Sequence, residues 1–316
     1  MINDKPKVIV ITGPTASGKS ALGVDAALAL DGEIINADSM QIYRELDVLT
    51  ARPAKDDLSK VPHQLYGTMS GSVRCSAEQW RNLALEEIEK VHNRGRVPIL
   101  VGGTGLYIRA LEKGIANIPD IPAEVRRQGQ ELLEQLGGEV FKQKLAESDP
   151  ETASRLHAGD SQRLIRAWEV ITHTGKSMLE WQKEAQGLVP NVDFIRFAMI
   201  PPREELYDNC NKRFQVMLDL GALKEVENLL ELAFDSSLPI MKALGVPELA
   251  EYLAGDVALD EAISRAQQNT RRYAKRQMTW IRTQYSDANI VNAKYSERLR
   301  GDFFTFIRQS GLTLSC

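Results

Sequence analysis

Short apolar runs alternate with longer amphipathic stretches along this chain. The runs are rich in valine and isoleucine and occupy residues 8–11, 32–37, 97–101 and 194–200. Apolar runs of this length, bounded by glycine and proline, are typical of strands buried on both faces of a parallel sheet. The first run leads into a helical pattern at Leu22, Ala26 and Leu30. This alternation predicts an α/β fold with a parallel sheet flanked by helices.

The segment from residue 117 to residue 189 departs from this alternation. It lacks β-branched apolar runs, and short helical patterns follow one another instead. We predict three helices there, at 124–136, after Asp149-Pro150, and at 160–173. The sequence therefore predicts a small all-α insertion domain at 117–189, set into an α/β core formed by 1–116 and 190–316.

Helical patterns dominate the rest of the chain, and a polar segment interrupts its first half. We expect helices at 76–92, 204–232 and 260–285, and a short closing helix from residue 298. Residues 44–71 contain Pro53 and Pro62 among mixed charges, which is typical of a long loop or lid.

Composition and charge exclude several classes of function. The net charge of −4 argues against a protein that coats nucleic acid indiscriminately, so any nucleic-acid contact must be a local basic patch. No apolar run is long enough to cross a bilayer, and residues 1–5 have no signal-peptide core. Cys75, Cys210 and Cys316 lie far apart, as expected for free thiols in a reducing cytoplasm. We therefore expect a cytoplasmic monomer without membrane contact.

A glycine-rich stretch follows the first predicted strand and opens the first helix. It consists of Gly13, Pro14, Thr15, Ala16, Ser17, Gly18, Lys19 and Ser20. In the G-x-x-x-x-G-K-[ST] pattern, glycines let backbone N–H groups converge on phosphate oxygens at the positive end of a helix. Lys19 supplies a mobile cation for the outer phosphate, and the Ser20 hydroxyl suits a Mg²⁺ ligand. The stretch predicts a site for a ligand that carries a diphosphate.

Polar segments also follow the second and third predicted strands. The second is followed by Asp38-Ser39-Met40-Gln41 and the third by Gly102-Gly103-Thr104-Gly105. The carboxyl ends of neighbouring parallel strands meet at one sheet edge, where ligands bind. Asp38 could therefore face the phosphates as an acid or base, or it could cap the next helix. A usual ATPase would end the third strand with aspartate to hold the water shell of Mg²⁺, so the glycines indicate a different reaction.

The helical pattern at 260–285 carries the clearest basic patch. No acidic residue occurs from Gln267 to Gln284, and Arg271, Lys275 and Arg282 share one face. The opposite face is an apolar stripe of Ala274, Met278, Ile281 and Tyr285. In an acidic protein, a cationic helix of this kind is a candidate contact for a phosphate backbone. We expect Trp280 to be a core residue.

These features fit a group-transfer enzyme best, in which one substrate carries a diphosphate and Asp38 activates a nucleophile. Two alternatives stay open from the residues alone. One is a kinase that acts on a nucleotide or a nucleic acid, and the other is a non-catalytic nucleotide switch that binds RNA. The sequence has no Asn-Lys-x-Asp guanine motif, which weakens the switch.

Six motifs, in order across nearly the whole chain, resemble those of the tRNA dimethylallyltransferases, the bacterial tRNA prenyltransferases. They occupy residues 13–20, 38–43, 102–107, 160–167, 201–207 and 275–282. The resemblance implies a P-loop NTPase-like core and transfer of a dimethylallyl group to N6 of the adenosine immediately 3′ of the anticodon. It further implies that the glycine-rich loop holds dimethylallyl diphosphate with Mg²⁺, rather than ATP.

The resemblance also implies catalytic roles for three residues. Asp38 would take the proton of the adenine amine, Thr104 would place the adenine or the diphosphate, and Arg213 would stabilise the leaving diphosphate with Lys19 and Ser20-bound Mg²⁺. The implied tRNA contacts near the base are Asp38, Ser39, Met40, Gln41 and Thr104. Those on the insertion are Arg126, Gln162, Arg163, Leu164, Ile165 and Arg166. Those on the last long helix are Lys275, Arg276, Gln277, Met278, Thr279, Trp280, Ile281 and Arg282.

Two positions depart from the family pattern. Val246-Pro247 stands where the family usually has an aromatic residue and a cation, so an RNA contact there is in doubt, and Asn209 replaces a commonly basic residue. The related adenylate isopentenyltransferases, which prenylate free AMP, share the phosphate loop and the segment around Asp38. The insertion and the acid-free helix favour tRNA, since a free nucleotide needs neither.

Overall fold

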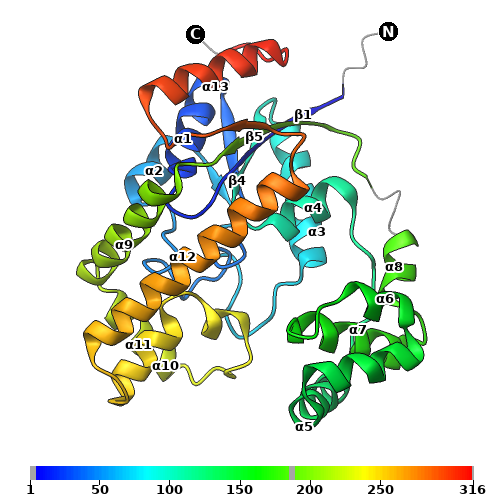
Figure 1. The fold of residues 1–316 in the computed structure, drawn as a ribbon. Helices are drawn as coiled ribbons and strands as arrows, with labels where there is room; N and C mark the ends of the chain where they lie inside the picture. The colour runs from blue at the N-terminus through cyan, green and yellow to red at the C-terminus, as the bar shows by residue number, and fades with distance from the viewer. Residues whose placement is uncertain (1–4, 185–188, 315–316) are drawn as a thin grey trace. The chain divides into compact units, whose positions relative to one another are not determined.

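The computed structural model of the chain describes residues 5–184 and 189–314 (Figure 1). Its centre is a six-stranded sheet with the strand order β3-β2-β4-β1-β5-β6, and all neighbouring strands are parallel. The strands are β1 (Lys7–Thr12), β2 (Gly32–Asn36), β3 (His63–Gln64), β4 (Val97–Gly102), β5 (Asp193–Met199) and β6 (Asn289–Val291). The predicted α/β class with a P-loop type of parallel sheet is confirmed. The pattern missed β3 and β6, which are too short to show periodicity.

The register of the sheet brings the predicted site segments to one edge. Thr12, the last residue of β1, pairs with Gly102 of β4 and with Ala198 of β5. Asn36, the last residue of β2, pairs with Val101. The loops that follow β1, β2 and β4 therefore leave the sheet side by side, at the carboxyl edge where ligands bind in open α/β sheets.

One face of the sheet is covered by α1 (Lys19–Leu30) and α13 (Glu297–Gln309), which lie together in Figure 1. Ile9 and Ile11 of β1 point toward this face and share a fully buried core with Leu22. The α13 helix adds Phe303, whose ring meets Phe197 edge-on at 5.0 Å. Burial of large side chains from both ends of the chain ties α13 to the first βα unit.

The opposite face is covered in part by α3 (Ala77–Asn93), which begins within one residue of the predicted helix at 76–92. Ser76 and Gln79 form a reciprocal capping box at 2.9 and 3.0 Å. Trp80 is fully buried, and its indole nitrogen donates to the Asn36 carbonyl at 2.9 Å. Its ring also stacks at 4.5 Å on Tyr107 of α4 (Gly105–Lys113). These contacts fix the loops after β2 and β4 relative to each other.

A group of helices follows β5, comprising α9 (Arg203–Asp219), α10 (Ala222–Glu231), η1 (Pro239–Lys242), α11 (Val246–Ala254) and α12 (Leu259–Gln284). The α12 helix packs against α9 and α11 (Figure 1). The single helix expected at 204–232 is wrong. Gly221 has φ 98° and separates α9 from α10, because only glycine enters this left-handed region without strain. The apolar stripe of α12 is confirmed, since Ala274, Met278 and Ile281 are buried.

The expectation of a loop or lid over residues 44–71 is only partly right. The segment contains the short helix α2 (Lys55–Lys60) and strand β3, and Leu46 within it is fully buried. The Glu225 carboxylate of α10 accepts hydrogen bonds from the backbone N–H groups of residues 47, 48 and 49 at 2.6 to 2.9 Å. Three charge-assisted bonds anchor this part of the segment to the helical group.

Residues 109–190 form a second compact unit, separate from the unit made by 1–108 and 191–316. It contains α5 (Ala123–Ser148), α6 (Pro150–Arg155), α7 (Ser161–Thr174) and α8 (Met178–Glu184). Gly137, with φ 70° and ψ 163°, breaks α5 where the sequence predicts a helix end. Asp149 and Asp160 accept backbone N–H bonds at the starts of α6 and α7, close to the predicted helix starts. Phe141, Leu145 and Leu164 form the buried core of this unit.

Within the described residues, no helix has the length and apolar character required to span a membrane. Cys75 and Cys210 are free thiols, as predicted. Cys316 and residues 1–4, which entered the expectations on thiols and on a signal peptide, lie outside the described residues.

Candidate active site

The glycine-rich loop at residues 13–20 connects β1 to α1 and has little room for side chains. Gly18 has φ 87°, and a Cβ there would lie 2.5 Å from the Cβ of Tyr295. A Cβ on Gly13 would lie 2.8 Å from the Met199 carbonyl oxygen. No side chain caps the N-terminus of α1, and its first turn carries no acidic residue. The helix therefore presents unpaired N–H groups and positive charge toward the loop, as an anion site requires.

Two cations lie at this loop. The Lys19 ammonium donates to the Pro14 carbonyl at 3.3 Å, and the Arg213 guanidinium of α9 donates to the Thr15 hydroxyl. Burial lowers the pKa of Lys19 to about 8; the Asp38 carboxylate opposes this shift, and the Arg213 charge adds to it. Burial also lowers the pKa of Arg213. Both cations are thus poorly solvated, which costs free energy. An anionic ligand between them would reduce this desolvation cost.

Asp38 leaves the end of β2 in a side-chain turn. Its Oδ1 accepts from the Met40 N–H at 2.9 Å, while its own N–H donates to Asn36 Oδ1 at 2.8 Å. No helix starts here, since the next one along the chain is α2, so the helix-cap interpretation is wrong. None of the described residues donates a hydrogen bond to Asp38 Oδ2. The turn fixes the carboxylate and leaves one oxygen able to accept a proton.

Thr104 lies beside this turn. Its hydroxyl oxygen accepts from the Ser39 N–H at 3.0 Å, and its own N–H donates to the Ala37 carbonyl at 3.2 Å. The backbones approach closely, because a Cβ on Gly102 would lie 2.1 Å from the Ala37 oxygen. The loops after β2 and β4 are therefore joined by hydrogen bonds, and these bonds hold the predicted residues Asp38 and Thr104 at the same end of the sheet.

The charge of Asp38 reaches side chains from several elements. Burial raises the pKa of Tyr66 and of Tyr273, and the nearby Asp38 carboxylate raises both further. The Thr104 side chain lies close enough to the Tyr273 hydroxyl of α12 to lower the pKa of that tyrosine, against the effect of burial. With Lys19 and Arg213, these tyrosines form an environment that is cationic toward the phosphate loop and aromatic toward α12 and the segment after β3.

Sequence reasoning missed Tyr66 and Tyr273 as members of this site. Tyr66 follows a two-residue strand that no pattern announces. Tyr273 did carry a signal, because it stands one helical turn before Gln277 on α12 and thus shares the inward face of that helix.

The residues expected to bind tRNA on α12 divide between the two faces of the helix. Lys275, Arg276, Thr279 and Arg282 are exposed. Gln277, Met278 and Ile281 are buried, and Trp280 is half-buried against Gly105, as expected for a packing residue. Near the base, Ser39, Met40 and Gln41 are partly buried, and the Gln41 amide donates to the carbonyls of residues 50 and 51 at 2.9 Å.

The expected tRNA contacts in the second unit lie on α5 and α7. Gln162 and Arg163 are exposed at the start of α7, where Arg163 pairs with Asp160 at 3.3 Å. Leu164 is fully buried, and Ile165 and Arg166 are partly buried. Arg166 pairs with Glu169 at 3.2 Å. Arg126 of α5 is partly buried, and its Nε makes no hydrogen bond with the described residues.

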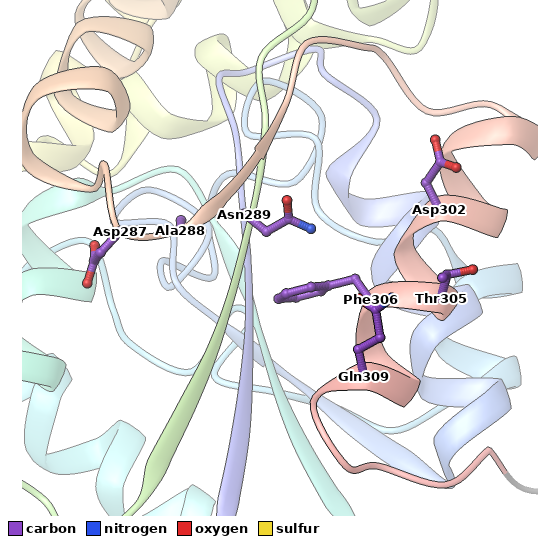
Figure 2. A pocket seen from close by; sticks show the side chains of 7 residues that line it. All are labelled: Asp287, Ala288, Asn289, Asp302, Thr305, Phe306 and Gln309. Carbon is purple, nitrogen blue, oxygen red and sulfur yellow. The ribbon is translucent and has the colours of Figure 1, made fainter.

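A hollow of about 500 Å³ lies away from these residues (Figure 2). Its lining comes from Asp287, Ala288 and Asn289 on one side and from α13 on the other. Asn289 begins β6, so the hollow adjoins the amino end of a strand, whereas the phosphate loop follows the carboxyl end of β1. It contains none of the predicted site residues.

Comparison with known proteins decides the family. The model of the family described as "IPP transferase" matches residues 41–284, which include the Thr104 loop, the insertion and α12. The chain belongs to the IPP transferase family. The resemblance seen in the six motifs is confirmed, and the chain is a prenyltransferase.

Individual members of the IPP transferase family match along most of their length. The tRNA dimethylallyltransferase of Rhodospirillum centenum is 51% identical over 282 residues, which cover 89% of this chain and 90% of the relative. That of Granulibacter bethesdensis is 47% identical over 312 residues, covering 96% and 98%. A crystal structure of tRNA isopentenylpyrophosphate transferase from Bacillus halodurans aligns with a TM-score of 0.70 at 33% identity, covering 96% of each chain.

Proposed function

We propose that this enzyme transfers a dimethylallyl group from dimethylallyl diphosphate to N6 of the adenosine immediately 3′ of a tRNA anticodon. Family membership and relatives named for this reaction support the proposal. The observation that carries it is the position of the Asp38 carboxylate, whose charge is felt by Lys19 and Arg213 at the phosphate loop. A base and a diphosphate cradle at one sheet edge suit displacement of diphosphate by a weak nucleophile.

The phosphate loop would hold the diphosphate of the prenyl donor. Its negative charge would replace the solvent that Lys19 and Arg213 have lost, and the open N-terminus of α1 would add hydrogen bonds. Charge grows on the diphosphate as the bond from carbon to oxygen breaks. Cations and N–H groups already fixed around the loop therefore stabilise the transition state more than the ground state.

Asp38 would act as the base toward the adenine amine. The lone pair of an exocyclic amine is delocalised into the ring, so the amine needs an acceptor for its proton as it attacks. Asp38 Oδ2 would take this proton while the new bond forms from N6 to the allylic carbon and diphosphate leaves. Thr104 would hold the base beside Asp38, since its hydroxyl is fixed by the Ser39 N–H and lies close to Tyr273.

Mg²⁺ fits this site only as a partner of the diphosphate. No cluster of three or more His, Cys, Asp or Glu side chains that could hold a metal occurs in the described part of the chain. The Ser20 hydroxyl is exposed at the first turn of α1 and suits the single protein ligand of a phosphate-bound magnesium ion. The ion would neutralise charge on the leaving diphosphate.

Two parts of the chain would bind the tRNA. The exposed cations of α12, Lys275, Arg276 and Arg282, would contact the phosphate backbone, and buried Met278 and Ile281 would support that face from within. The helical insertion at 117–189, with Arg126 and the start of α7, would contact the anticodon arm. The target adenosine would have to leave its stack to reach Asp38, at a cost of about a few kcal/mol.

The test is transfer of radiolabelled dimethylallyl from its diphosphate to an unmodified anticodon stem-loop, comparing wild type with Asp38→Asn. Asparagine can still accept the Met40 N–H bond, so the variant removes basicity and keeps the turn. We expect the rate constant of transfer to fall by about 10²- to 10⁴-fold, with RNA binding unchanged. Asp219→Asn, an exposed change on α9, is the matched control.

Other outcomes would change the function assigned to this enzyme. ATP-dependent phosphorylation by the wild type without prenyl transfer would indicate a kinase, and transfer to AMP as fast as to the stem-loop would indicate an adenylate isopentenyltransferase. Binding of nucleotide and RNA without any transfer would indicate a switch. Full activity of Asp38→Asn would keep the function and refute the base.

A further inference from the structure

Gln277 connects two loops of the site that are far apart in the sequence. Its Oε1 accepts from the Thr15 N–H in the phosphate loop at 2.8 Å, and its Nε2 donates to the Gly103 carbonyl at 2.9 Å. Gln277 is only 6% exposed and its bond to the Gly103 carbonyl is buried, so water does not compete for that bond. One amide group thus joins the loop after β1 to the loop that carries Thr104.

The pairing requires an amide group and an adjacent glycine. A carboxylate could accept from Thr15 but could not donate to Gly103, and an apolar side chain could do neither. A Cβ on Gly103 would lie 2.2 Å from Gln277 Nε2, so the glycine makes room for the contact. Loss of the amide would leave the buried Gly103 carbonyl and the partly buried Thr15 N–H without these partners, and unpaired buried polar groups are costly.

Three residues that follow one another along the same face of α12 lie against the Gly103–Gly105 turn. Tyr273 lies close to Thr104, Gln277 donates to the Gly103 carbonyl, and the Trp280 ring covers Gly105, where a Cβ would come within 2.3 Å of it. The middle contact continues to the phosphate loop, because the same Gln277 amide accepts from the Thr15 N–H. There, Thr15 is held through its N–H by Gln277 and through its hydroxyl by Arg213.

We propose that Gln277 is a positioning residue that holds the phosphate loop in register with the Thr104 turn. It would thereby set the distance from the diphosphate of the donor to the base that receives the prenyl group. This role rests on the proposed prenyl transfer, but its effect on the phosphate loop does not. It also separates Gln277 from its exposed neighbours on α12, which face solvent rather than the site.

The main test variant is Gln277→Met, which keeps the length of the side chain and removes both hydrogen bonds. We expect the dissociation constant for inorganic diphosphate, measured by calorimetry, to rise about tenfold. The KM for dimethylallyl diphosphate should rise similarly and kcat should fall at least tenfold, because misplaced reactants lose orientation. The dissociation constant for the anticodon stem-loop should stay within twofold. Gln284→Met, an exposed change on the same helix, is the control.

Gln277→Glu provides a second variant if the first does not fold. It keeps the bond to Thr15, loses the bond to Gly103 and adds negative charge near the loop, so diphosphate binding should weaken by more than tenfold. The proposal is overturned if either folded variant binds diphosphate as the wild type does. The proposal is also overturned if kcat falls only in proportion to the folded fraction while KM stays constant. That result would mean that Gln277 contributes only to packing. Failure of the wild type to prenylate RNA would refute the proposed function and leave the diphosphate measurement intact.

Discussion

The buried charge of Lys19 lowers the free energy of unfolding of the ligand-free enzyme, and a substitution can reveal this. Burial lowers its pKa from the ordinary value of 10.5 to about 8. Since a tenfold change in an equilibrium is worth about 1.4 kcal/mol, holding the ammonium in the folded state costs about 3 kcal/mol at neutral pH. Lys19→Met removes the charge and also the hydrogen bond to the Pro14 carbonyl, which is worth about 1 kcal/mol. We therefore expect the ligand-free variant to be more stable than wild type by about 2 kcal/mol near pH 7.

The pH dependence of this difference identifies its cause. Between about pH 8 and 10.5 the unfolded chain still binds the Lys19 proton and the folded chain does not, so wild-type stability rises with pH. The advantage of Lys19→Met should shrink over that range and be nearly lost by about pH 9.5. Urea unfolding at several pH values measures both quantities, with Lys275→Met on the exposed face of α12 as the control.

Calorimetry with inorganic diphosphate completes this test, because the stabilised variant should lose most of its affinity for the ligand. A Lys19→Met protein that is less stable than wild type at pH 7, or whose advantage is the same at all pH values, would refute the reasoning. Such a result would mean that Lys19 is well solvated in the empty loop.

Two further predictions concern the packing and the charges of α12. Gly105→Ala would place a methyl group 2.3 Å from the Trp280 ring, so we expect a loss of about 1 to 3 kcal/mol of stability by urea unfolding. Gly301→Ala, which adds a methyl group in open space within α13, should instead stabilise by up to about 1 kcal/mol; equal effects of the two changes would contradict the packing argument. Lys275→Glu with Arg282→Glu should weaken stem-loop binding at least tenfold and reduce its salt dependence, with diphosphate affinity unchanged. Unaltered RNA binding by this pair would remove α12 from the proposed interface.

The pattern of the chain predicts its local structure well where the cause is local. The glycines and lysine of residues 13–20, the helix start near Ser76 and the break at Gly137 all depend on neighbouring backbone, so the sequence could predict them. The helix break at Gly221 was equally local and was missed, because an apolar periodicity runs on across it. The strand pattern predicts the right edge for Asp38, and of its two interpretations the helix cap is excluded by the side-chain turn with Met40.

The family resemblance implied an RNA contact for every residue of one motif on α12, residues 275–282. A helix presents successive residues to different sides, and its orientation depends on what it packs against. The buried side includes Gln277 and Met278, and the exposed side includes Lys275 and Arg282. The motif alone could not divide them by role.

The sequence by itself determined the α/β class, the phosphate loop, the carboxylate at the neighbouring strand end and the family. Each of these depends on residue type and on spacing over a few turns of chain. Only the tertiary structure decided that Tyr66 and Tyr273 lie within reach of the charge of Asp38, and that Gln277 joins Thr15 to Gly103. Those contacts span up to 262 residues, and they follow from strand register and helix packing, which arise from the burial of the whole core rather than from any one segment.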